Sequence, residues 1–224
     1  MSLVLRKMAW IAPLALLLAV PAHAQDPRIE IQGWAGYTFS DGVSGDAREG
    51  SDGNIYNQID PKSSGSYGLS LGFFVTEQVE VGFLWDRQGT VLEAKGNATT
   101  DVADLNIDNY HGFFAYNFGD VDDTIRPYVL GGLGMTRYSD IRVRGLLEER
   151  TIPSDSRFST TWGAGVKIYP ANNFGIFGGV RWTPTYIKTD AAGWWCDPWW
   201  GCWVVGNAQY SNQWEFAAGV NLRF

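Results

Sequence analysis

The chain has 224 residues and a formal net charge of −7, with 17 basic and 24 acidic side chains. Such an acidic protein is a poor nucleic-acid binder, because phosphate contacts need clustered lysine and arginine. After the N-terminal segment no apolar run reaches the roughly 18 residues that a transmembrane helix requires, and the remaining length suits one all-β domain.

Residues 1–24 have the features of a secretory signal peptide. Arg6 and Lys7 form a short basic region, an apolar stretch covers 8–20, and Ala22-His23-Ala24 is an A-x-A cleavage pattern. We therefore expect export and a mature barrel domain spanning 25–224. Since no cysteine directly follows the cleavage site, a lipid anchor is not expected.

Period-two alternation of apolar and polar residues predicts eight strands in the mature chain. They are expected at roughly 28–40, 65–76, 79–90, 105–118, 125–138, 158–169, 174–188 and 209–224. Short connections, near 76–78, 119–124 and 170–173, alternate with long ones at about 41–64, 91–104, 139–157 and 189–208. This alternation is typical of an up-and-down barrel with tight periplasmic turns and longer outer loops.

One face of these strands is apolar and aromatic, and the other is polar. The apolar face of the last strand carries Tyr210, Trp214, Phe216, Ala218, Val220, Leu222 and Phe224. Its other face carries Gln213, Glu215, Ala217, Gly219, Asn221 and Arg223. Strands 28–40, 79–90 and 105–118 divide in the same way. In strands 125–138 and 174–188 the sequence does not decide which alternate set of side chains faces outward. Apolar-out and polar-in is the inverse of a water-soluble barrel, so we predict an all-β, eight-stranded antiparallel up-and-down transmembrane β-barrel.

Ionisable residues gather on the predicted inner face. They are Glu30, Glu80, Asp86, Lys167, Arg181, Glu215 and Arg223, with Arg126 as a candidate further member. An eight-stranded barrel is only just wide enough for its own side chains, and unpaired buried ions cost several kcal/mol each. Two interpretations stay open: a salt-bridge network that plugs the lumen, and the selectivity filter of a small-solute pore.

His111 is the only histidine that remains after the signal peptide. A catalytic interpretation would make it the general base of a membrane lipase or acyltransferase. No serine lies within two residues of it, and nothing in the sequence places a Ser-His-acid set. We therefore predict a hydrogen-bonding lumen residue, and no catalytic, metal or cofactor site.

Cys196 and Cys202 are the two cysteines of the chain. Because an exported protein with two cysteines usually pairs them, we predict a disulfide, and a zinc site would need more ligands. Trp199 and Trp200 lie between them, and three further tryptophans flank the pair. The tryptophans could pack on one another, anchor at the membrane interface, or bind a sugar or a protein, and Trp199 and Trp200 are the candidates for binding.

Several segments resemble known outer-membrane barrels. Residues 126–134, Arg-Pro-Tyr-Val-Leu-Gly-Gly-Leu-Gly, resemble the penultimate-hairpin pattern of OmpA-like transmembrane barrels, and 162–169 are similar to the strand that follows it there. Residues 216–224 resemble the terminal β-signal that the outer-membrane assembly machinery reads. This implies that the assembly signal consists of Phe216, Val220, Leu222 and Phe224. No peptidoglycan-binding domain follows Phe224, so OmpX-like and OmpW-like barrels are the nearer comparison and cell-wall tethering is not expected.

The resemblance implies an integral outer-membrane protein with a structural or surface-interaction role in the cell envelope. The alternative is a narrow, porin-like channel for small or hydrophobic solutes, as in OmpW-like barrels, and a lipid-modifying enzyme is a third class. The expected partners are outer-membrane lipid and lipopolysaccharide and the outer-membrane assembly machinery. We expect no nucleic acid among them, and a monomeric chain.

Overall fold

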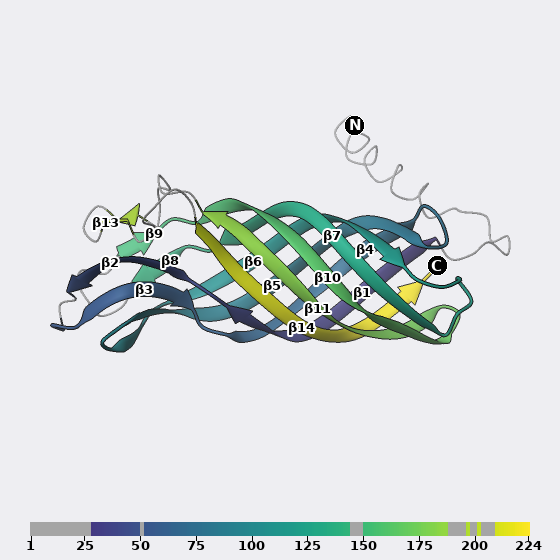
Figure 1. The fold of residues 1–224 in the computed structure, drawn as a ribbon, viewed down its shortest axis with the longest axis horizontal. Coiled ribbons are helices and arrows are strands. Elements are labelled where there is room, and N and C mark those ends of the chain that lie inside the picture. Colours follow the sequence, from purple (N-terminus) through teal and green to yellow (C-terminus); the bar gives the residue numbers. More distant parts are fainter. Residues whose placement is uncertain (1–27, 50–51, 144–149, 188–195, 198–200, 203–208) are drawn as a thin grey trace, which may run out of the picture.

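The computed structural model describes residues 28–49, 52–143, 150–187, 196–197, 201–202 and 209–224, and in these ranges every regular element is a strand (Figure 1). Eight antiparallel strands close into a barrel, which confirms the predicted fold. Around the barrel they are β1 (Ile29–Ser40), β4 (Ser64–Phe74), β5 (Val79–Gly96), β6 (Thr99–Asn117), β7 (Ile125–Tyr138), β10 (Asp155–Ala171), β11 (Phe174–Ile187) and β14 (Gln209–Arg223). Pairing of β14 with β1 closes the ring. Within the described ranges there is no helix long and apolar enough to cross a lipid bilayer.

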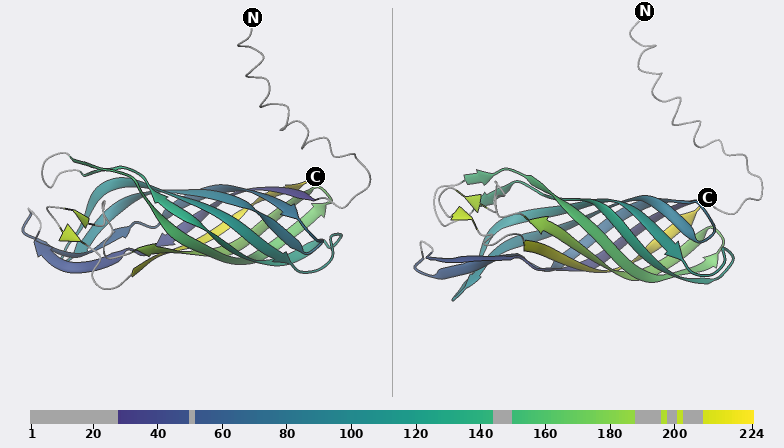
Figure 2. Two further views of the ribbon diagram at one scale, coloured as in Figure 1. Left: turned by 90° about the horizontal axis from the view of Figure 1, so that it is seen from above. Right: turned by 45° about the horizontal axis from the view of Figure 1, so that its top comes forward.

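The barrel has two unlike ends, on the right and left of Figure 1. At the turn end, β1 begins, β14 ends, and three short connections span 75–78, 118–124 and 172–173. At the hairpin end, β2 (Val43–Glu49) and β3 (Ile55–Pro61) form a hairpin that pairs with β5 and projects beyond the barrel (Figure 2). The smaller pairs β8 (Ile141–Val143) with β9 (Arg150–Ile152), and β12 (Cys196–Asp197) with β13 (Gly201–Cys202), also lie at this end.

The hairpin end contains more strand than the sequence predicted. The expected loops at 41–64 and 91–104 were wrong. The first contains β2 and β3, and in the second β5 and β6 stay paired, with a register shift between Leu92 and Glu93, up to a two-residue turn. The reason is an apolar core at this end of the barrel, which buries the apolar side chains that alternate along the extended strands. Its buried residues include Val43, Tyr56, Ile59, Leu92, Leu105, Ile107, Tyr138 and Ile187. This hairpin-end core joins residues of β2 and β3 to residues of the barrel strands β5, β6, β7 and β11.

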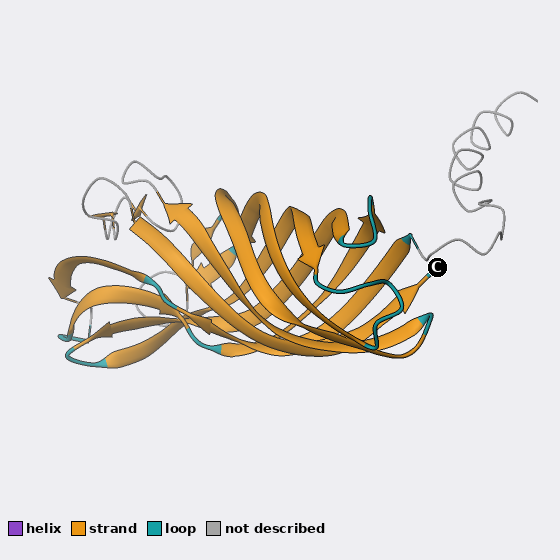
Figure 3. Cartoon of the chain, turned by 45° about the vertical axis from the view of Figure 1, so that its right-hand side comes forward, coloured by secondary structure: helices purple, strands orange, loops and turns teal. Residues whose placement is uncertain are grey.

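The side chains of the barrel strands alternate between lipid-type and lumen-type environments, as predicted for the last strand. Phe216 and Val220 are 55 % and 47 % exposed, whereas Glu215 and Asn221 are 5 % and 0 % exposed. In β7, where the sequence did not decide which side chains face outward, Leu133 points outward with 63 % exposure. Figure 3 shows how these strands tilt around one continuous wall.

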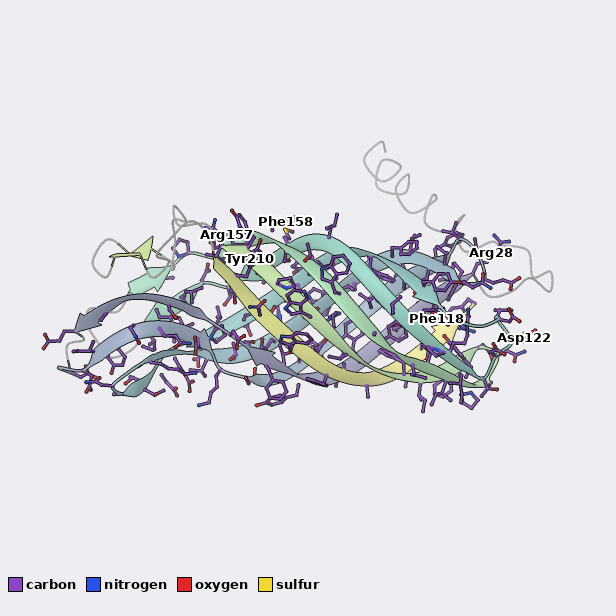
Figure 4. The ribbon with its side chains drawn as sticks, viewed as in Figure 1. Arg28, Phe118, Asp122, Arg157, Phe158 and Tyr210 are labelled. Carbon is purple, nitrogen blue, oxygen red and sulfur yellow. The ribbon has the colours of Figure 1, made fainter. Side chains whose placement is uncertain are left out.

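Two belts of exposed aromatic residues encircle the barrel, one near each end. The belt at the turn end includes Phe73, Tyr116, Phe118, Phe174 and Phe224. The belt at the opposite rim includes Tyr37, Phe39, Tyr67, Phe158 and Tyr210. Figure 4 labels Phe118 at one end and Phe158 and Tyr210 at the other. Aromatic belts that flank an outward apolar band are typical of a membrane-spanning barrel.

Gly68 gives a direct test of how tightly the barrel interior packs. A methyl group at Gly68 would overlap the Trp34 indole and come within 2.6 Å of the Trp85 carbonyl oxygen. We expect Gly68→Ala to lower the free energy of unfolding by about 1–3 kcal/mol, the usual cost of overpacking, as measured by urea titration in detergent. Gly33→Ala is the control, because its methyl would meet only Leu69 Cδ2 at 3.4 Å. Equal stabilities of the two variants would contradict a close-packed interior.

Candidate functional site in the barrel lumen

The ionisable residues that the sequence assigned to the inner face all lie inside the barrel. They are Glu30 on β1, Glu80 and Asp86 on β5, Lys167 on β10, Arg181 on β11, and Glu215 and Arg223 on β14. The side chain of Arg181 is 10 % exposed and the other six residues are at most 5 % exposed. Their salt bridges divide them into two groups, a turn-end cluster and a mid-barrel cluster.

The turn-end cluster consists of Glu30, Glu80, Lys167 and Arg223. Lys167 Nζ lies 2.6 Å from Glu30 Oε1 and 2.8 Å from Glu80 Oε2. Arg223 Nε lies 3.0 Å from Glu30 Oε2, which also accepts a 2.6 Å hydrogen bond from the Tyr169 hydroxyl. Because Glu30, Glu80 and Lys167 come from three strands that are not neighbours, the cluster links opposite parts of the wall across the lumen.

The mid-barrel cluster consists of Asp86, Arg181 and Glu215. Arg181 Nη2 lies 2.6 Å from Asp86 Oδ2 and 2.5 Å from Glu215 Oε2, so one guanidinium bridges two carboxylates. The guanidinium carbon lies 5.1 Å from the Trp34 ring centroid. Glu215 Oε1 accepts two further hydrogen bonds, from the Ser66 hydroxyl at 2.6 Å and the Trp34 indole at 3.3 Å. These contacts hold both carboxylates in place within the lumen.

An apolar layer lies beside the two clusters. It consists of Trp34, Leu84, Phe113, Ala115 and Phe177. A cavity of about 50 Å³ touches this layer, both clusters and the wall between them. A water needs about 10–15 Å³ of such volume, so the cavity has room for a few water molecules.

Neutral polar side chains continue the lumen packing toward the hairpin end. Asn109 Nδ2 donates to Asp86 Oδ1 at 2.8 Å and to Gln213 Oε1 at 3.2 Å. Gln213 Nε2 in turn donates to Gln88 Oε1 at 3.0 Å. This hydrogen-bonded chain connects the mid-barrel cluster to the region below the hairpin-end core.

His111 has a serine partner that the sequence did not reveal. Its Nε2 lies 2.9 Å from Ser159 Oγ, and both residues are buried, on β6 and β10. Nδ1 of His111 has no hydrogen-bond partner among the described residues, so no acid orients the ring there. Ser159 Oγ also accepts a 3.0 Å hydrogen bond from Thr136. Among the described residues no acid completes a triad with His111 and Ser159.

Arg126 also lies in the lumen, fully buried at the turn end of β7. Its Nη2 donates to the backbone carbonyl of Glu77 at 2.6 Å, and no ion pair joins it to a carboxylate in the described ranges. With Arg126 included, the charges of the lumen balance: Glu30, Glu80, Asp86 and Glu215 oppose Arg126, Lys167, Arg181 and Arg223. The balance is uneven in space, because the turn-end cluster together with Arg126 has one excess positive charge.

The sequence matches a known family. A model of the outer membrane protein beta-barrel domain matches residues 11–224. The chain belongs to this family. It is therefore an outer-membrane protein, in which the turn end faces the periplasm and the hairpin end the exterior.

Solved barrels share the fold at low sequence identity. The crystal structure of OprG from Pseudomonas aeruginosa is 14 % identical, with 89 % of this chain and 97 % of that chain covered and a TM-score of 0.57. Neisserial surface protein A is 15 % identical, with coverages of 88 % and 97 % and a TM-score of 0.52. AlkL in DMPC bilayers is 11 % identical, with coverages of 92 % and 94 % and a TM-score of 0.50. No curated protein sequence matches the chain significantly.

Some predicted features fall partly or wholly outside the described residues. The signal peptide at 1–24 and the candidate binding residues Trp199 and Trp200 lie wholly outside them. The backbones of Cys196 and Cys202 are described and stand directly opposite each other in the β12–β13 pair. Opposed residues of antiparallel strands have Cα atoms about 4.5–5.5 Å apart, a spacing that disulfides accept. The disulfide itself stays a prediction.

Proposed function

We propose that this protein is a closed-lumen barrel with a structural and surface-interaction role in the outer membrane, and that it does not conduct solutes. The observation that carries the proposal is the filled lumen. Side chains from opposite parts of the wall meet at the turn-end cluster, the apolar layer and the mid-barrel cluster. A solute would have to break these contacts in turn, because they lie in series along the barrel axis.

The projecting hairpins outside the membrane support the interaction part of the proposal. Ion pairs stiffen them: Lys95 Nζ lies 2.8 Å from Asp60 Oδ2, and Lys62 Nζ lies 3.0 Å from Glu93 Oε1. At the tip, the Tyr56 hydroxyl donates to Asp52 and lowers the pKa of that carboxyl to about 2. A pre-ordered, charged extension loses little conformational entropy when it binds a partner.

The outer rim of the barrel supports lipopolysaccharide as a neighbour. Phe158 and Tyr210 are labelled at this rim in Figure 4, and each is 57 % exposed. Aromatic side chains near the end of the membrane-spanning strands are suited to the interface with a lipid that combines acyl chains with a polar headgroup. Trp199 and Trp200 stay part of this proposal as candidate contacts on the same side of the membrane.

A liposome swelling assay tests the closed lumen. Folded protein in liposomes loaded with an impermeant polymer is expected to give the same swelling rate in arabinose or glycine as protein-free liposomes, because no continuous aqueous path crosses the barrel. A general porin in matched liposomes sets the positive reference, and heat-modifiable gel mobility verifies that the barrel is folded. Swelling that rises with the amount of inserted protein would overturn the proposal in favour of a narrow channel.

A further inference from the structure

The periplasmic mouth of the barrel contains a pocket of about 280 Å³. Three of its lining residues, Arg28, Arg126 and Arg223, are arginines, and one, Glu77, is acidic. The pocket lies at the turn end, apart from the smaller cavity between the two clusters, since the two share no lining residue. It is thus a separate, strongly basic concavity in an acidic protein.

Arg126 is unusual in this pocket because its charge is buried without a counter-ion. Its relative exposure is 0 %, and its guanidinium carbon lies 5.8 Å from the Phe74 ring centroid. Nη2 donates to the Glu77 backbone carbonyl, whereas Nε and Nη1 have no hydrogen-bond partner among the described residues. A buried guanidinium with unmet donors costs free energy unless something fills them.

Arg223 adds a further unmet donor. Its Nε pairs with Glu30 and its Nη1 donates to the Val121 carbonyl at 3.4 Å. Its Nη2 is buried without a partner in the described part of the chain. Glu30 is already shared with Lys167, so the turn-end cluster cannot neutralise Arg126 as well. The carboxylates of Glu77 and Asp123 lie near the mouth, yet neither forms an ion pair with Arg126 in the described ranges.

We propose that this pocket binds a phosphate group from the periplasmic side, with Arg126 and Arg223 as its hydrogen-bond donors. Donors on two guanidinium groups, and a third arginine at the rim, suit an anion with several acceptor oxygens. Two sources offer that chemistry at this level of the membrane: a soluble phosphate in the periplasm and the headgroup of an inner-leaflet phospholipid. Either would neutralise the excess charge of the turn-end cluster and Arg126. The site goes beyond the structural role proposed above and does not depend on it.

The binding test uses the folded full-length barrel in a maltoside detergent that contains no phosphate. Inorganic phosphate is titrated calorimetrically at constant ionic strength set with chloride, and dihexanoyl phosphatidylglycerol is titrated below its critical micelle concentration as the lipid arm. Saturable binding is expected in at least one arm. Tighter binding of inorganic phosphate assigns the soluble source, and tighter binding of the lipid assigns the headgroup.

Two arginines of one strand provide a matched pair of variants. Arg126→Gln is expected to weaken phosphate binding at least tenfold, whereas Arg137→Gln, at the exposed far end of β7, removes the same charge and is expected to leave binding unchanged. Arg126→Lys keeps the charge with fewer donors and is expected to bind with intermediate affinity. It also serves as the test variant if Arg126→Gln does not fold.

A stability measurement gives an independent readout. Ligands that bind only the folded state raise its stability, so phosphate is expected to shift the urea midpoint of the parent protein upward and to leave that of Arg126→Gln unmoved. Absence of saturable binding in both arms would overturn the site. So would equal binding by the parent and Arg126→Gln, or an equal loss in Arg137→Gln, which would indicate a general charge effect.

Discussion

Arg181→Ala is expected to lower the free energy of unfolding of the barrel by about 3–5 kcal/mol, the range observed when one partner of a buried ion pair is removed. The guanidinium bridges Asp86 and Glu215 in the lumen, with only 10 % of its side chain exposed. Its loss would leave two carboxylates facing each other without a cation. Urea unfolding of the folded protein in detergent, followed by tryptophan fluorescence, measures the change.

Two further variants separate charge from packing. Arg181→Met combined with Asp86→Asn and Glu215→Gln removes all three charges and is expected to recover most of the lost stability, since an apolar or neutral replacement of a complete buried ion group is often tolerated. Arg137→Ala, on the exposed face of β7, is expected to change stability by less than about 0.5 kcal/mol. A change that small in Arg181→Ala would mean that water already solvates Arg181, and the closed lumen would lose its main support.

The sequence predicts the membrane-spanning strands well because each must present one continuous apolar face to lipid. The segment predicted at 125–138 coincides with β7, Ile125–Tyr138, and the other barrel strands are found close to where the alternation placed them. Outside the membrane this constraint is absent. The segment 91–104 contains Gly96, Asn97 and several charged residues, which favour a loop, although its apolar positions pack in the hairpin-end core.

The sequence predicts which residues line the lumen, but it does not predict which of these side chains form ion pairs or hydrogen bonds with each other. Alternation identifies which side chains point inward. Glu30–Arg223 and Arg181–Glu215 join adjacent strands, but the other lumen ion pairs join strands that are not neighbours. Lys167 meets Glu30 and Glu80, and His111 meets Ser159, only because the tilt and stagger of the strands bring those levels together. The missing counter-ion of Arg126 depends on the same geometry, so no local sequence pattern could have signalled it.

The second large effect is expected at the end of the chain. Phe224→Asp is predicted to block insertion into the outer membrane, so that the protein accumulates in the periplasm without heat-modifiable mobility. The Phe224 side chain is 68 % exposed on the lipid-facing side of the barrel. An acidic residue near the interface of a folded barrel costs only about 0–1 kcal/mol, too little to abolish folding. Loss of insertion would therefore reflect failed recognition by the assembly machinery.

Position and backbone effects need their own controls. Phe174→Asp places the same charge at the same end of the barrel, since Phe174 pairs with Leu222, and it is expected to assemble because it lies outside the terminal signal. Deletion of Phe224 removes the backbone as well, including the 2.9 Å hydrogen bonds from Phe224 N to the Ile29 carbonyl and from Arg28 N to the Phe224 carbonyl. If only the deletion fails, these seam bonds matter and the aromatic ring does not. Normal assembly of all three variants would contradict an assembly signal in 216–224, whereas failure of Phe224→Asp alongside normal Phe174→Asp would assign recognition to the terminal ring.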